Sequence, residues 1–170
     1  MRLPPDHRIN HPEPPVLATE LNPDQSLTLI SAENAGAVLT FTYGNTGAGQ
    51  DEYMGLSGLA ERYGFIMVAP DGTPSTGADE ARFWNASSAC CNWEGAELDD
   101  VGYISSLIDG VKTKYRIDDK RVFILGHSNG AFMAHRLAYE RSADIAAVVS
   151  LAGADEVGER PAPPHPVHVL

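Results

Sequence analysis

The sequence predicts an α/β fold with a mostly parallel β-sheet and helices on both of its faces. Two observations favour this fold class. Short apolar runs of strand length alternate along the chain with longer segments of helical character. The runs are apolar throughout, which is typical of strands buried on both faces. A chain of 170 residues suits a single domain with a sizeable core.

The expected elements follow one another in a regular order. Residues 1–24 hold many of the prolines and are expected to form an irregular lead-in, with residues 25–170 as the N-terminal portion of a single domain. Predicted strands lie at 27–30, 37–43, 65–69, 121–125 and 146–151, and Val167-His168-Val169-Leu170 has the character of a further one. Predicted helices lie at 51–63, 98–115 and 131–138. A long loop, 70–97, lies at the carboxyl ends of the strands, where loops of that length are usually functional.

Composition excludes several classes of partner. The net charge of −11 disfavours nucleic acid, which needs a basic face, and also anionic membrane surfaces. No apolar run approaches the length of a membrane span, and residues 1–7 lack the apolar region of a signal peptide. The chain is therefore either intracellular or begins upstream of Met1. No sequence pattern calls for a metal or another cofactor.

The two cysteines, Cys90 and Cys91, are adjacent. They match no zinc-binding spacing. Adjacent cysteines rarely bond to each other, because the bond requires a strained local geometry. Two interpretations stay open, a pair of small unbonded residues and a disulfide to a cysteine outside this chain.

The run Gly126-His127-Ser128-Asn129-Gly130 carries the main chemical signal. It fits the G-x-S-x-G pattern, follows the apolar strand 121–125 and precedes the helix 131–138. A strand, a sharp turn and a helix form a nucleophile elbow, which holds the serine hydroxyl out on a strained corner. We therefore expect Ser128 to be a nucleophile, which needs a neighbouring base to become reactive. The alternative is an ordinary βα turn.

A glycine loop, 44–49, follows the strand 37–43. No Gly-Lys-Ser/Thr follows it, so it is not a P-loop, and Thr46 stands where a dinucleotide fingerprint needs glycine. We expect an oxyanion hole instead, with one N–H from Asn129 and another from Asn45 or Thr46. Each such donor contributes roughly 3–4 kcal/mol to transition-state stabilisation. A plain glycine-rich connection is the alternative.

Several stretches in the same order resemble the polyhydroxybutyrate depolymerase and feruloyl esterase-like family of α/β-hydrolases. The resemblance covers roughly 38–154, and its matching stretches are residues 44–47, 56–65, 68–73, 84–86, 90–91, 99–103, 121–122 and 126–130. It implies carboxylic ester hydrolysis through an acyl-enzyme. It also implies short polyester units or aromatic acids esterified to plant polysaccharide as substrates, and an extracellular location.

The sequence departs from that family in two ways. Tyr43-Gly44 replaces the usual His-Gly at the end of the oxyanion strand. The resemblance also implies that the catalytic acid and base lie beyond Leu170, so that the chain is truncated at its C-terminus. A local triad of Ser128, Asp155 and either His165 or His168 is the less favoured alternative, because a frayed proline-rich tail holds a histidine badly.

The remaining alternatives concern the loop aromatics and the function itself. Trp84 and Trp93 are expected to line a substrate pocket, or else to cover the core. Asp99 and Asp100 are expected to cap a helix rather than to act in catalysis. The scaffold also suits a peptidase or a thioesterase, and a catalytically inactive remnant or binding module is the principal alternative to an esterase.

Overall fold

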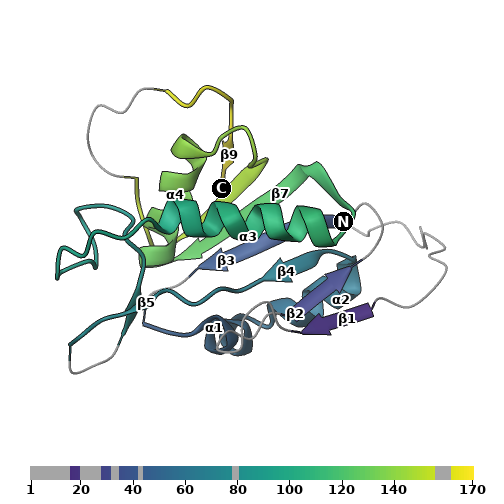
Figure 1. The fold of residues 1–170 in the computed structure, drawn as a ribbon, viewed down its shortest axis with the longest axis horizontal. Coiled ribbons are helices and arrows are strands. Elements are labelled where there is room, and N and C mark those ends of the chain that lie inside the picture. Colours follow the sequence, from purple (N-terminus) through teal and green to yellow (C-terminus); the bar gives the residue numbers. More distant parts are fainter. Residues whose placement is uncertain (1–15, 20–27, 32–34, 42–43, 78–80, 156–161) are drawn as a thin grey trace, which may run out of the picture.

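The computed structural model describes residues 16–19, 28–31, 35–41, 44–77, 81–155 and 162–170 (Figure 1). Its centre is a sheet of five strands in the order β4-β3-β7-β8-β9, and every pairing within it is parallel. The strands are β3 (Ala35–Phe41), β4 (Ile66–Val68), β7 (Ile117–His127), β8 (Ala147–Leu151) and β9 (His168–Val169). The predicted parallel α/β sheet is confirmed.

Helices cover both faces of this sheet. They are α1 (Gly47–Met54), α2 (Leu56–Tyr63), α3 (Asp100–Lys114) and α4 (Asn129–Glu140), and α3 runs across the front of the strands in Figure 1. Ile66 and Val68 of β4 belong to the core cluster that contains α3 and α4, whereas Met67 belongs to the cluster that contains α2. Successive side chains of a strand point to opposite faces, so the two clusters lie on opposite sides of the sheet.

The predicted helix 51–63 is two helices. Gly55 adopts φ 66° and ends α1, where its N–H donates to the carbonyl of Asp51 at 2.6 Å. A left-handed residue interrupts a helix, and glycine takes that conformation without steric cost. The first helix also starts earlier than predicted, because the Thr46 side chain accepts the N–H of Gly49 at 3.0 Å and caps its N-terminus.

Two regions predicted to be irregular contain short strands. In the lead-in, β1 (Val16–Thr19) pairs antiparallel with β2 (Thr28–Ser31), which corresponds to the strand predicted at 27–30, while the rest of residues 1–24 lies outside the described residues. Within the long loop, β5 (Thr73–Pro74) pairs antiparallel with β6 (Arg82–Phe83). Both are local pairings outside the main sheet. In the described part of the chain, no helix has the length and apolar character needed to cross a membrane.

Candidate active site

Ser128 occupies the corner between β7 and α4. Its backbone has φ 55° and ψ −124°, a conformation that a residue with a side chain rarely adopts. The surrounding backbone holds it there, since the Ser128 N–H donates to the carbonyl of Leu151 at 2.9 Å. Strain of this kind persists where neighbouring structure enforces it, and it clusters at functional sites. The geometry is that of the predicted elbow.

Gly126 permits the close contact that the corner requires. A Cβ added at this position would lie 2.2 Å from the carbonyl oxygen of Gly130, in the first turn of α4. Gly153, in the loop after β8, is similarly close, because its Cβ would lie 2.9 Å from the Ser128 carbonyl oxygen. The turn is therefore packed against backbone on two sides, and this packing explains the glycine at position 126.

The glycine loop leaves the sheet at the same edge as Ser128. Phe41 of β3 is in register with Gly126 of β7, and parallel neighbours end on the same side of a sheet. Two bonds hold the loop in place: Gly44 N–H donates to the Arg82 carbonyl at 2.7 Å, and Gly47 N–H donates to Asp71 Oδ1 at 2.7 Å. Tyr43 lies outside the described residues.

The N–H of Thr46, one of the two loop donors predicted for an oxyanion hole, already has a hydrogen-bond partner. The N–H of Thr46 donates to the side-chain oxygen of Asn45 at 3.0 Å, so a substrate oxygen would have to displace that contact. Beside them lies a pocket of about 400 Å³ that is mostly polar. Its walls are Gly44, Asn45, Thr46, Pro74, Ser75 and Arg82. The Arg82 guanidinium donates to the Gly72 carbonyl at 2.8 Å and lies 3.7 Å from the Asp71 carboxylate.

The two loop tryptophans have different environments. Trp84 is 1% exposed, belongs to the main core and stacks on Tyr103 at a ring distance of 6.4 Å. The core alternative is therefore correct for Trp84, because a side chain enclosed in this way presents no surface to a ligand. Trp93 is 75% exposed and remains a candidate for binding substrate.

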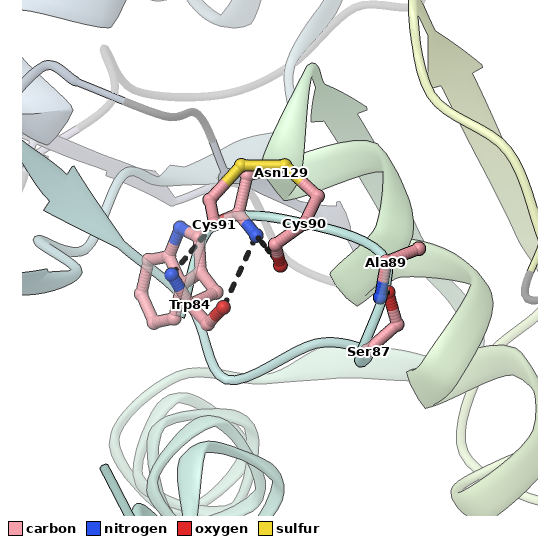
Figure 2. The surroundings of a disulfide bond; sticks show 6 residues. All are labelled: Trp84, Ser87, Ala89, Cys90, Cys91 and Asn129. Atoms are coloured by element: carbon pink, nitrogen blue, oxygen red, sulfur yellow. Dashed lines mark hydrogen bonds between the residues drawn. A yellow bond between two sulfur atoms is a disulfide. The ribbon is translucent and has the colours of Figure 1, made fainter. Parts of the chain in front are cut away.

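Cys90 and Cys91 form a disulfide with each other (Figure 2). This is neither of the two arrangements favoured from the sequence. Cys91 takes the unusual φ of 105°, and Cys90 forms an isolated β-bridge with Ser87. The pair lies against the start of α4, as the position of Asn129 in Figure 2 shows.

The side chain of Asn129 is the main feature that the sequence did not indicate. It is fully buried, and its Oδ1 accepts a hydrogen bond from the backbone N–H of Trp84 at 2.6 Å. Its Nδ2 donates to the Trp84 carbonyl at 3.1 Å and to the Cys90 carbonyl at 3.3 Å. The only sequence signal was the amide residue itself, since its partners lie about 40 residues away along the chain.

Asn85, next to Trp84, is held between α3 and α4. Its N–H donates to Asp100 Oδ2 at 2.6 Å, and its carbonyl accepts from the Arg136 guanidinium. Burial raises the pKa of Asp100, although the Asn85 hydrogen bond and Arg136 partly oppose that effect. Asp99 caps α3 by accepting the Gly102 N–H at 2.8 Å, which confirms the predicted capping role.

The described histidines and Asp155 do not assemble the local triad. His165 donates its N–H to Ser142, past the C-terminal end of α4, whereas Ser128 precedes its N-terminal end, and 12 helical residues span about 18 Å. His168 is level with Ala147 and Phe123, about 13 Å before the end of β7. Asp155 accepts a hydrogen bond from Tyr139 at 2.7 Å.

The other two histidines near the elbow have their own contacts. His135 lies 3.1 Å from the Ser150 hydroxyl, as a structural residue would. The ring of His127 lies 6.5 Å from that of Tyr53. Among the residues that the structure describes, no three His, Cys, Asp or Glu side chains gather as metal ligands would.

Comparison with known proteins identifies relatives of this chain. The sequence model of the family described as esterase PHB depolymerase matches residues 45–162. Feruloyl esterase B of Neurospora crassa is 29% identical over 104 residues, which cover 60% of this chain and 34% of that protein. Acetylxylan esterase A of Talaromyces purpureogenus is 33% identical over 110 residues, covering 63% and 27%. The chain thus spans about a third or less of the length of these relatives.

Solved structures share its fold. An acetyl xylan esterase from Aspergillus awamori superposes with a TM-score of 0.56 at 28% identity, covering 79% of this chain and 49% of that one. The fluorophosphonate-binding serine hydrolase F of Staphylococcus aureus gives a TM-score of 0.56 at 14% identity, covering 81% and 57%. The second likeness shows the fold alone. Together they identify the sheet as that of an α/β-hydrolase.

Proposed function

Because the chain belongs to the esterase PHB depolymerase family, we propose that it forms part of a serine carboxylic-ester hydrolase that works through an acyl-enzyme. The observation that carries this proposal is the backbone of Ser128. Its φ of 55° and ψ of −124°, at the corner between β7 and α4, are strained and are held by neighbouring backbone. Such a corner presents a hydroxyl at the carboxyl edge of the sheet, where α/β folds bind ligands.

In the proposed reaction, Ser128 Oγ forms a bond to the ester carbonyl carbon while a general base takes its proton. The carbonyl oxygen then carries negative charge, and the N–H of Asn129 and an N–H of the Asn45–Thr46 loop donate to it. Collapse of this intermediate breaks the bond to the alcohol, which leaves with a proton, and water then hydrolyses the acyl-serine.

We place the general base and its carboxylate partner after β9. The positions of His165 and His168 support this proposal, because both lie away from the edge that carries Ser128. The order of the sheet supports it too, since β9 adds to β8 on the side away from β3. Because β9 runs parallel to β8, its chain direction leads toward the carboxyl edge of the same sheet.

For the substrate, we propose a polyester or an ester of a feruloyl-type acid. The names of the relatives, feruloyl and acetylxylan esterases, support carboxylic esters on polysaccharide. The exposed ring of Trp93 supports an aromatic or sugar ring as a contact. We also propose an extracellular location, because a disulfide within the chain is typical of oxidising compartments.

The test is to trap the acyl-enzyme on the full-length protein that contains this chain. The protein is mixed with p-nitrophenyl acetate, quenched in acid and digested, and the peptide carrying Ser128 is examined for an acetyl group by mass spectrometry. We expect acetylation of Ser128, a burst of p-nitrophenol, and neither in Ser128→Ala. A folded protein without turnover or acetylation would contradict the proposal and favour a binding module.

A further inference from the structure

The Asn129 side chain uses its hydrogen-bonding groups in a way that few residues can. It accepts one hydrogen bond, from the backbone N–H of Trp84, and donates two, to the backbone carbonyls of Trp84 and Cys90 (Figure 2). The residue is fully buried, so water cannot substitute for these partners. Only a primary amide offers both an acceptor and two donors in one plane. We call Asn129, Trp84 and Cys90 the amide clamp.

The amide clamp joins the nucleophile corner to the loop that faces it. Asn129 directly follows Ser128 and is the first residue of α4. The N–H of a first-turn residue has no carbonyl partner within its own helix, so it can donate to a substrate oxygen. Its direction depends on the orientation of the peptide between Ser128 and Asn129. The side chain of Asn129 fixes that residue to a second segment and so limits its rotation.

The partner segment is itself held from other directions. The Trp84 ring is packed in the core, and Asn85 bonds to Asp100 of α3 and Arg136 of α4. At the Cys90 end, the bond between adjacent sulfurs constrains the peptide that carries the Cys90 carbonyl. The amide clamp thus has two fixed ends, one made by packing and one made by a covalent bond.

We propose that the Asn129 side chain is a positioning residue, which aims the Asn129 N–H at the developing oxyanion, and that the Cys90–Cys91 disulfide fixes one of its partners. This inference rests on the proposed esterase function. It predicts that disturbing the amide slows the chemical step more than it weakens substrate binding, because the donor matters most when the oxygen carries charge.

The decisive variant is Asn129→Asp in the full-length protein. The carboxylate keeps the shape of the amide but replaces both N–H donors with an oxygen that faces two carbonyls. With p-nitrophenyl acetate, we expect kcat to fall roughly 10- to 100-fold while KM changes less than about threefold. Asn129→Ser, which is neutral and small, should show the same split and serves if the aspartate variant does not fold.

Asn92→Asp is the matched control. The Asn92 side chain also makes three hydrogen bonds, one with Asn85 and two with Ala96, and all three join residues of the same loop rather than a residue of α4. The control should lose stability and keep kcat within about twofold of the parent, if orientation of the elbow N–H is what Asn129 contributes. An equal fall in kcat for Asn92→Asp and Asn129→Asp would overturn the inference.

The covalent end is tested with the double variant Cys90→Ala, Cys91→Ala. It leaves the Asn129 amide and the Trp84 bonds intact, so kcat should fall by a factor between those of the control and of Asn129→Asp. A double variant with the parent kcat would remove the disulfide from the proposal. A double variant as slow as Asn129→Asp would show that the Cys90 carbonyl is the dominant partner.

Failure of the inference and failure of the proposed function give different results. Turnover retained in Ser128→Ala would refute the function, whatever Asn129 does. If Ser128→Ala is inactive and Asn129→Asp and Asn129→Ser keep the parent kcat, only the positioning role fails. If the parent itself is inactive, amide hydrogen exchange decides. The backbone N–H of Trp84, whose acceptor is Asn129 Oδ1, should exchange at least about tenfold faster in Asn129→Ser than in Asn92→Asp. Equal rates would refute the amide clamp.

Discussion

A Cβ on Gly126 would lie 2.2 Å from the carbonyl oxygen of Gly130. The end of β7 and the first turn of α4 therefore contact each other through backbone atoms, with no room for a methyl group at position 126. This contact lies next to Ser128, which directly precedes the first residue of α4. The corner is a consequence of packing at two positions, four residues apart, on either side of the serine.

Gly126→Ala should destabilise the protein by about 3 kcal/mol or more, because backbone on both sides would have to move. The measurement is the free energy of unfolding in urea. Gly58→Ala in α2 is the control, since a Cβ there meets no atom within 4 Å. The substitution also removes a glycine from the interior of a helix. It should raise stability by about 0.5–1 kcal/mol. If Gly126→Ala unfolds at the parent urea concentration, the close contact is not present.

Ser128→Gly should be more stable than Ser128→Ala by about 1 kcal/mol, although both lack the hydroxyl. Alanine keeps a side chain at φ 55° and ψ −124°, whereas glycine adopts that conformation freely at some cost in chain entropy. Chemical unfolding of both variants checks the order. A more stable alanine variant would mean that the corner is relaxed.

Asp100 should make the protein less stable as pH rises through the weakly acidic range. Burial raises its pKa, so the folded state holds the proton more tightly than the unfolded chain does. Stability falls as pH rises from the unfolded pKa, about 3.9, through the raised folded value, and the loss is complete above that value. Asp100→Asn should remove this part of the pH profile of unfolding free energy.

Asp144 is the control, because its pKa is shifted in the opposite direction to that of Asp100. Burial tends to raise its pKa, but its ion pairs with Arg141 and Lys112 outweigh that and lower it. The stability that Asp144 contributes is present above the unfolded pKa and is lost as pH falls through the lowered folded value. Asp144→Asn should therefore flatten the acid limb instead. Identical profiles for the two variants would contradict the assigned environments.

The two tryptophans should separate stability from binding. Trp84→Ala removes a side chain that is 1% exposed and should cost about 3–5 kcal/mol of unfolding free energy. Trp93→Ala, at a position 75% exposed, should leave unfolding within about 0.5 kcal/mol and raise KM for an aromatic ester relative to an acetyl ester. An unchanged ratio of KM values would exclude Trp93 from the substrate contacts.

Local patterns predicted most of the sheet and its helices. The apolar strands, the helix at 98–115 and the elbow all depend on neighbours in sequence, and each lies within a few residues of its predicted position. The break at Gly55 was visible only as a glycine within a helical pattern, which is often tolerated. The structure places a left-handed Gly55 between Met54 of α1 and Leu56 of α2, which pack against the same core cluster.

The site could be predicted only in part. Ser128 follows from a five-residue pattern, but the amide contact to Trp84 joins positions 45 residues apart and has no local signature. The burial of Trp84 depends on Tyr103 and the main core in the same way. The bond between Cys90 and Cys91 depends on an unusual backbone at Cys91, which composition does not reveal.

The Cys90–Cys91 disulfide closes a ring with no residue between its ends. Cross-links stabilise proteins largely by restricting the unfolded chain, and this effect grows with the length of the loop that is closed. A ring between neighbours restricts the unfolded chain least of all. Opening it should barely move the melting temperature, so a thermal screen would classify the cysteines as dispensable even where enzyme rate depends on them.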